Sequence, residues 1–255
     1  MIDLRGRVAL VTGGSRGIGR ACALRLAEAG ADVIVNYVTA ESAARDVAGE
    51  ILSLGRRTAI VKADVGEQDD CASMMEFVQS EFGKLDVLVS NAASGGFRPL
   101  LASTTRHFEA TMKTNVLALI QLVQAGLRLL ERATGRGKVI VLSSHGSHMA
   151  LPMYGMIGSS KAALESLARH FALELGDRGI NVNIVKAGLV DTDSTRALPQ
   201  ADQMFEAARK FRGMTGDRFL TPSDVADAVL FLASPLSDMV QGETLTVDGG
   251  AAVHA

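Results

Sequence analysis

Short apolar runs of four to nine residues alternate along the chain with longer segments in which apolar residues recur every three or four positions. The short runs, such as VALVT at 8–12 and DVIVNY at 32–37, are apolar almost throughout. Continuous apolar runs are typical of strands buried on both faces of a parallel sheet. Strands are predicted at 8–12, 32–37, 58–64, 85–91, 138–144, 180–188 and 243–250, and helices at 17–29, 40–54, 67–82, 103–132, 153–176 and 222–233.

This strand–helix alternation predicts an α/β fold, a Rossmann-type doubly wound parallel sheet of about seven strands with helices on both faces. No repeat, low-complexity stretch or linker divides the sequence, so residues 1–255 are predicted to form a single domain. The more polar stretch at 192–218 holds a short helical pattern at 201–211. Ligands bind outside the carboxyl ends of the strands in open α/β sheets, so we expect a substrate lid here, with an ordinary surface excursion as the alternative.

Composition narrows the class of protein. Apolar residues make up 47% of the 255 residues and the net charge is −2, so no basic field favours nucleic acid or an anionic membrane. No apolar run reaches the roughly 18 residues of a membrane span, and the first residues lack the pattern of a secretory signal. Cys22 and Cys71 lie in apolar helical patterns and are expected to be reduced thiols. We therefore expect a cytoplasmic protein with no metal site.

A glycine-rich segment, TGGSRGIG at 12–19, joins the first predicted strand to the first predicted helix. Glycines allow a tight turn and a close backbone approach to a pyrophosphate, which binds at the free N–H groups of the helix N-terminus. A dinucleotide site is expected in this context. Its predicted contacts are Gly13, Ser15, Arg16, Gly17, Ile18 and Gly19.

The end of the second predicted strand indicates which dinucleotide is bound. An acidic residue there would bind the ribose 2′-hydroxyl of NAD, but this chain has Asn36 and Tyr37. Arg16 in the glycine loop supplies a permanent, forked cation that suits a 2′-phosphate. We therefore predict NADPH, with Asn36 and Tyr37 near the adenosine. The alternative for Arg16 is a plain solvated charge.

Taken together, these features resemble the short-chain dehydrogenase/reductase family over nearly the whole chain. The matching segments are TGGSRGIG, Asp64-Val65, Asn91-Ala92-Ala93, Asn115 in MKTNVLALI, Ser144, Lys186-Ala187-Gly188 through Thr192, and Val247-Asp248-Gly249-Gly250. The resemblance implies cofactor contacts at Asp64, Val65, Asn91, Ala92, Lys161, Gly188, Val190 and Thr192. It further implies catalytic roles for Ser144, Asn115 and Lys161, and a homotetramer.

The catalytic tyrosine is where the sequence departs from the usual family pattern, Tyr-x-x-x-Lys. Ile157 stands four residues before Lys161, and Tyr154 stands seven residues before it. Steps of four and seven residues both keep two side chains on one helix face, but they rise by about 6 Å and about 10 Å respectively. Tyr154 is therefore expected to act roughly one helical turn farther from Lys161.

Such an offset suits conjugate reduction, in which negative charge develops on a carbonyl oxygen two carbons away from the hydride acceptor. The seven-residue spacing also resembles the enoyl-acyl-carrier-protein reductases of this family. We therefore predict NADPH-dependent reduction of the C2–C3 double bond of a trans-2-enoyl thioester in fatty-acid elongation, with acyl-carrier protein or coenzyme A as the carrier.

Two other functions stay open. Ser144 and Asn115 are features of the ketone-reducing members, so the first alternative is a ketoreductase acting on a polyketide-like or other secondary-metabolite carbonyl. The second is a catalytically inactive NADP(H)-binding protein. The presence of Lys161, Ser144 and Asn115 argues against the latter.

Overall fold

The computed structural model describes residues 2–196, 201–210 and 218–254. Seven parallel strands form one sheet in the order β3-β2-β1-β4-β5-β6-β7. Their bounds are β1 Val8–Val11, β2 Asp32–Tyr37, β3 Thr58–Lys62, β4 Val87–Ser90, β5 Gly137–Ser144, β6 Ile180–Ala187 and β7 Thr244–Val247. The predicted Rossmann-type, single-domain fold is confirmed.

The strand order changes direction at β1, which pairs with β2 on one side and with β4 on the other. Val11 at the end of β1 is in register with Val35 of β2 and Val89 of β4. The connections that follow β1 and β4 leave the sheet in opposite directions and open a crevice at the carboxyl ends of the strands. Crevices of this kind are where doubly wound sheets bind their ligands.

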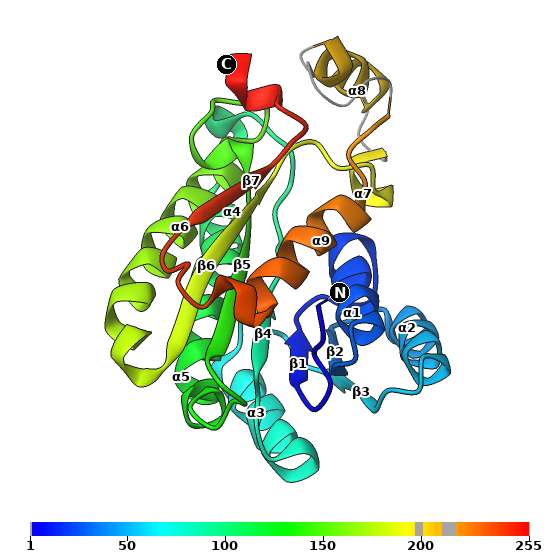
Figure 1. Cartoon of the computed structure of the whole chain (residues 1–255). Coiled ribbons are helices and arrows are strands. Elements are labelled where there is room, and N and C mark those ends of the chain that lie inside the picture. The colour runs from blue at the N-terminus through cyan, green and yellow to red at the C-terminus, as the bar shows by residue number, and fades with distance from the viewer. Residues whose placement is uncertain (1, 197–200, 211–217, 255) are drawn as a thin grey trace.

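Helices cover both faces of the sheet (Figure 1). Their bounds are α1 Gly17–Glu28, α2 Glu41–Ser53, α3 Gln68–Phe82, α4 Thr105–Met112, α5 Ala118–Leu130, α6 Gly155–Leu175 and α9 Pro222–Ala233. Side chains alternate between the faces of each strand. Ala9 and Val11 accordingly pack with α1, α2 and α9 in one core cluster, whereas Val8 and Leu10 pack with α3, α5 and α6 in the other.

The helix predicted at 103–132 is wrong as a single element. It consists of α4, a turn of π-helix at Lys113–Leu117, and α5. A π-turn inserts a residue into the helical repeat and is frequent at functional sites. Here it holds Asn115, which is buried. The hydrophobic periodicity continues through the turn, so the sequence pattern did not reveal the interruption.

Several predicted strands end earlier than expected, and most of the missing residues lie at the carboxyl edge. The predicted strand 58–64 ends at Lys62, 85–91 is Val87–Ser90, and 243–250 is Thr244–Val247. Residues past these strand ends form loops instead. Asn91, for example, donates from its backbone N–H to the Thr12 hydroxyl rather than to a neighbouring strand.

The expected lid at 192–218 is described only in part, because 197–200 and 211–217 lie outside the described residues. The described part contains α7 Asp193–Arg196 and α8 Ala201–Lys210, and α8 lies at the margin of the molecule in Figure 1. Phe205 of α8 is buried and packs edge-on against Phe219. Its role as a lid stays a prediction. No helix among the described residues is long and apolar enough to cross a membrane.

Candidate active site

The glycine loop between β1 and α1 has the geometry of a phosphate cradle. Gly13 and Gly17 adopt positive φ angles of 61° and 55°, which side chains other than glycine rarely allow. A Cβ at Gly19 would lie 2.2 Å from the Gly13 carbonyl oxygen, so the first turn of α1 packs directly on the loop. The N–H groups at the start of α1 are thereby available to an anion, and the loop fits a dinucleotide pyrophosphate.

Three polar side chains hold this loop in place. The Gly13 N–H donates to Asn36 Oδ1 at 3.1 Å, and Asn91 Nδ2 donates to the Thr12 carbonyl at 2.8 Å. The Thr12 hydroxyl accepts from the backbone N–H of Asn91 and of Ala92, each at 3.0 Å. The ends of β2 and β4 are thus tied to the loop that follows β1.

Asn36 therefore has a supporting role that the sequence analysis did not anticipate. Its side chain is fully buried, and its Nδ2 also donates to the Ala63 carbonyl at 2.9 Å. An aspartate there would lose this donor and bury a charge. A direct contact between the Asn36 side chain and the cofactor stays a prediction.

The other predicted nucleotide contacts surround the same crevice. Arg16 at the N-cap of α1 is exposed, and within the described residues its guanidinium makes no ion pair. Ser15 and Tyr37 are buried, and Ile18 packs against the core. Val65 is buried as well, and Asp64 accepts from the Gly66 N–H at 2.9 Å. Arg16 has no ion-pair partner among the described residues, and no carboxylate stands at the end of β2. The site therefore fits a 2′-phosphate.

The segment after β6 borders the same crevice. The Gly188 N–H donates to the Val247 carbonyl at 2.9 Å, and a Cβ at Gly188 would lie 2.9 Å from Asp248 Cβ. Val190 is buried and forms a bridge with Leu220. The Thr192 methyl lies 3.7 Å from the position of a Cβ on Gly17, so this segment reaches the glycine loop.

The structure brings Tyr154 and Ser144 together, although ten residues separate them. Tyr154 caps the N-terminus of α6, and Ser144 is the last residue of β5. Their side-chain oxygens are hydrogen-bonded at 3.0 Å. Two hydroxyls that converge in this way are suited to hold a single substrate oxygen.

The position of Tyr154 depends on a glycine opposite its ring. A Cβ on Gly146 would lie 2.4 Å from two ring carbons of Tyr154, so only glycine leaves room for the ring. Phe97 packs on the ring with a centroid distance of 5.5 Å. Met153, just before the tyrosine, has a φ of 60° and is the one non-glycine residue with a positive φ in the described chain. Such strain is frequent next to functional residues.

Ile157, the residue at the usual tyrosine position, is part of the packing between α6 and the loop after β4. It is buried, and a Cβ on Gly95 would lie 2.5 Å from its Cγ1. The described chain therefore presents no hydroxyl at the four-residue spacing. Burial raises the pKa of Tyr154, and the Ser144 hydrogen bond opposes this in part, so the tyrosine is a neutral phenol at neutral pH.

Lys161 lies in α6 with its ammonium buried near the end of β5. Its Nζ donates to the Leu142 carbonyl at 2.7 Å. Burial lowers the pKa of Lys161 to about 8, opposed by the negative charge of Glu165 one turn along the helix. No contact between the Lys161 ammonium and the Tyr154 hydroxyl occurs in the described structure. The predicted contact of Lys161 with the nicotinamide ribose stays a prediction.

Asn115 is placed behind Lys161 by the π-turn. Its Oδ1 accepts from the Ser94 N–H at 2.7 Å, and its Nδ2 donates to the Ser94 carbonyl and to the Ser160 hydroxyl, both at 2.9 Å. The amide thus joins the loop after β4 to the residue before Lys161. Its expected part in a proton relay stays a prediction.

A buried ion pair behind Lys161 was missed by the sequence analysis. Glu165 accepts from the Ser143 hydroxyl at 2.5 Å, and its other oxygen lies 3.2 Å from Lys186 Nζ. The side chains of Glu165 and Lys186 are only 10% and 11% exposed. The four-residue step from Lys161 to Glu165 was the available signal, but nothing in the sequence indicated that Lys186 would reach the same carboxylate.

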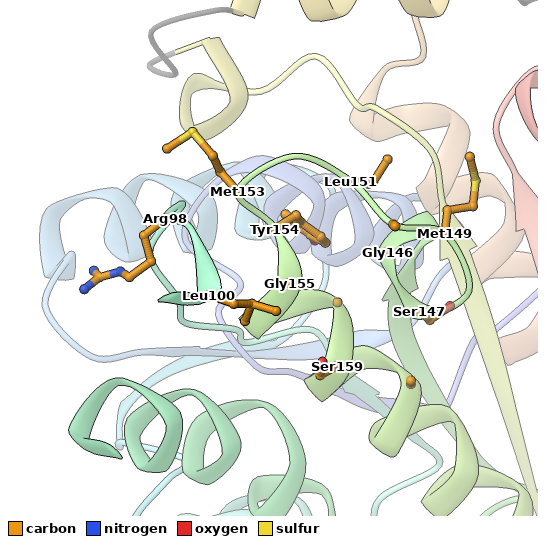
Figure 2. Close-up of a pocket in the computed structure, with 13 residues that line it drawn as sticks. Arg98, Leu100, Gly146, Ser147, Met149, Leu151, Met153, Tyr154, Gly155 and Ser159 are labelled. Carbon is orange, nitrogen blue, oxygen red and sulfur yellow. The ribbon is translucent and has the colours of Figure 1, made fainter. Parts of the chain in front are cut away.

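A cavity of about 490 Å³ lies next to the Tyr154–Ser144 pair and is large enough for a small organic substrate. Figure 2 shows Tyr154 in the middle of its wall, with Ser147 and Met149 on one side and Leu100 and Arg98 on the other. The lining is largely apolar. Ser147 Oγ is a polar exception, buried with no hydrogen-bond partner among the described residues.

The comparisons with known proteins agree with this geometry. The family model that matches residues 13–252 carries the description "Enoyl-(Acyl carrier protein) reductase". The 1-cyclohexenylcarbonyl-CoA reductase of Streptomyces collinus is 34% identical over 98% of this chain and 89% of its own. Versicolorin reductase 1 of Dothistroma septosporum is 35% identical over 97% of each chain.

Among solved structures, a short-chain dehydrogenase from Burkholderia cenocepacia in complex with NADP superposes with a TM-score of 0.89. It is 37% identical and covers 98% of this chain and 99% of its own. The chain belongs to the short-chain dehydrogenase/reductase family. It is an oxidoreductase of that family, as the sequence predicted.

Proposed function

We propose that this short-chain reductase uses NADPH to reduce a carbonyl group of a polyketide-like or other secondary-metabolite substrate. The observation that carries the proposal is the 3.0 Å hydrogen bond between Tyr154 and Ser144 beside a largely apolar cavity. Ser144 and Asn115, both features of the ketone-reducing members, are next to or behind the same site.

The relatives favour a substrate other than the straight-chain intermediates of fatty-acid elongation. Two of them are named for the reduction of 1-cyclohexenylcarbonyl-CoA and of versicolorin. Neither name describes a straight-chain fatty acyl intermediate. The main expectation from the sequence, fatty-acid elongation, thus has less support than its alternative.

The choice of NADPH rests on the residues around the glycine loop. The exposed Arg16 has no acidic partner in the described residues, and no carboxylate ends β2 to repel a 2′-phosphate. The similar Burkholderia structure was solved with NADP. When bound, NADPH would supply the hydride at its nicotinamide ring.

The residues of the site then act on the substrate oxygen. Tyr154 and Ser144 bind the carbonyl oxygen, and the Tyr154 phenol gives its proton to that oxygen as the carbonyl carbon gains the hydride. The C=O bond becomes an alcohol, and the tyrosinate that remains recovers a proton from solvent. The buried Lys161 ammonium supplies positive charge beside the site, which favours the anionic oxygen.

A second reaction is favoured by one specific observation, the position of Tyr154 at the cap of α6, seven residues before Lys161. The seven residues correspond to roughly 10 Å of helix rise, and a phenol at that distance along the helix would suit an oxygen that lies away from the hydride acceptor. In an α,β-unsaturated thioester the hydride reaches the β-carbon, and Tyr154 would stabilise the enolate oxygen. The name 1-cyclohexenylcarbonyl-CoA describes a conjugated thioester of this kind.

A side-by-side assay separates the two reactions. NADPH oxidation is followed with a cyclic β-ketoacyl thioester and with the matching cyclic 2-enoyl thioester. Oxidation with the keto compound supports the proposed function, and oxidation with the enoyl compound alone supports conjugate reduction. Inactivity with both, while NADPH still binds, would contradict both and restore the inactive NADP(H)-binding alternative.

The proposal also covers the location of the enzyme, its oligomeric state and the form of its substrate. We infer a cytoplasmic enzyme, a homotetramer, and a carrier-bound or coenzyme A thioester as one form of substrate. Measurement of the mass in solution tests the tetramer, and a monomer at micromolar concentration would contradict it.

A further inference from the structure

The outer end of the substrate cavity contains a cation that the proposed chemistry does not use. Arg98 lines the cavity together with Leu100, Met153 and Tyr154. Figure 2 shows its guanidinium at the edge of the cavity, directed away from the Tyr154 ring. It is therefore not directed at the Tyr154–Ser144 pair, and the proposed proton transfer does not account for its position.

The described structure gives Arg98 no acidic partner. The side-chain hydrogen bonds of its guanidinium come from Nη1 alone, which lies 2.7 Å and 2.6 Å from the two ring nitrogens of His107. His107 Nδ1 also lies 3.2 Å from the Thr104 backbone nitrogen. An imidazole carries no negative charge, so His107 cannot balance the charge of Arg98.

A backbone hydrogen bond fixes the main chain of Arg98 beside the tyrosine. The Arg98 N–H donates to the Met153 carbonyl at 2.9 Å, which ties Arg98 to the residue before Tyr154. A Cβ on Gly96 would lie 2.4 Å from Arg98 Nη2. A methyl group at position 96 would therefore displace the guanidinium.

The Nε–H and Nη2–H groups of Arg98 have no partner among the described residues. Gly96 packs against this same edge of the guanidinium, so the edge is not open as it stands. The positive charge is nevertheless unpaired at the edge of a largely apolar cavity, which suits a ligand with an apolar body and an anionic outer end.

We propose that Arg98 is a substrate-binding residue that holds an oxyanion at the outer end of the substrate, while the reacting carbonyl lies at Tyr154 and Ser144. The inference rests on the proposed reductase function and specifies its substrate class. The oxyanion is either the phosphate of a pantetheine arm or a carboxylate on the substrate body. His107 is a positioning residue, because it acts only through Arg98.

The test is a binding measurement that needs no turnover. Calorimetry on the NADP⁺-saturated full-length enzyme compares 4′-phosphopantetheine with pantetheine, and cyclohexanecarboxylate with cyclohexanecarboxamide. The members of each pair differ in the charge of one group, and saturation with NADP⁺ removes competition for the dinucleotide site. We expect at least one anion to bind roughly tenfold more tightly than its neutral partner, which is the range of a charge-assisted bond.

Three variants assign that preference to Arg98. Arg98→Gln abolishes it, and Gly96→Ala weakens it by displacing the guanidinium without removing the charge. The control is Arg106→Gln, an exposed arginine of α4, which keeps the preference. Preference for phosphate identifies a pantetheine handle, and preference for carboxylate identifies an acid on the substrate body.

Equal binding of each anion and its neutral partner would overturn the inference, as would a preference that survives Arg98→Gln. Failure of the reductase proposal is recorded separately, as absence of NADPH oxidation with both thioesters. An enzyme that binds anions through Arg98 but reduces neither thioester would therefore contradict the reaction and leave the Arg98 site established.

Discussion

The two halves of the crevice differ in how closely they follow the family pattern. On the nucleotide side, the glycine loop is held by Thr12, Asn36 and Asn91 through hydrogen bonds between 2.8 and 3.1 Å. On the substrate side, the tyrosine is displaced by one helical turn and its place is taken by Ile157. The difference shows that the same fold can bring a tyrosine to the end of β5 from outside the usual position, because the Tyr154 hydroxyl still reaches Ser144.

Among variants that keep Tyr154, the largest effect is expected where the ring of this tyrosine is packed. In Gly146→Ala the new methyl group would overlap the Tyr154 ring, so the ring and its hydroxyl must move away from Ser144. We expect kcat to fall by about 100-fold, the lower end of what a positioned general acid contributes, with NADPH affinity unchanged. Steady-state kinetics and NADPH titration measure both.

Gly49→Ala is the matched control, because a Cβ at Gly49 of α2 meets nothing within 4 Å. It should leave both constants unchanged. A Gly146→Ala enzyme with full turnover would show that the Tyr154–Ser144 geometry is not required.

The nucleotide side gives the next largest effect. Arg16→Gln should raise the Kd of NADPH about tenfold and leave that of NADH within about twofold, since only the 2′-phosphate needs the cation. Arg20→Gln is the control, because Arg20 is already paired with Glu50 at 2.7 Å. An equal loss for both cofactors would exclude a contact between Arg16 and the 2′-phosphate.

The pH dependence of kcat/KM tests whether Glu165 and Lys186 influence the protonation of Lys161. The lowered pKa of about 8 means that the free enzyme loses the Lys161 proton as pH rises through 8, so kcat/KM for reduction should fall there. In Lys186→Met the charge of Glu165 is no longer balanced, which raises the pKa of Lys161. The basic limb of the profile should therefore move to higher pH by roughly half a unit to one unit.

For the pH experiment, Lys62→Met is the control because Lys62 is exposed on β3. A purely structural role of Lys186 would lower the whole profile without moving its basic limb. Movement of the limb to lower pH would contradict the expected electrostatic coupling between Glu165 and Lys161.

The smallest effect concerns the strained residue before the tyrosine. Met153→Gly relieves a positive φ at a side chain that is 48% exposed, and it should stabilise the protein by about 1 kcal/mol at most. Met149→Gly, at a residue without positive φ, should not stabilise. Chemical denaturation compares the two, and a destabilised Met153→Gly protein would show that the backbone there is not strained.

The fold could be predicted because its signals are local. Continuous apolar runs mark the strands, and the glycine loop lies between a strand and a helix in both prediction and structure. The nucleotide contacts predicted from the same loop stay predictions, and the buried, loop-supporting role of Asn36 needed the structure.

The substrate side could be predicted only in part, because it depends on contacts between distant segments. The seven-residue spacing was visible, but the packing of Tyr154 on Gly146 and the reach of Lys186 to Glu165 were not. The π-turn at Asn115 was hidden because its apolar residues keep the helical period. The position of Arg98 at the cavity could not be predicted, because an isolated arginine in a loop is usually a solvated charge.

In the proposed mechanism the Tyr154 hydroxyl, held by Ser144, supplies the proton or the hydrogen bond to the substrate oxygen. The most direct measurement is kcat of Tyr154→Phe with the thioester that the wild-type enzyme reduces, together with its Kd for NADPH. A fall of about 100-fold or more in kcat with Kd unchanged is the predicted result. Unchanged turnover in the phenylalanine variant would contradict the claim and remove Tyr154 from the mechanism.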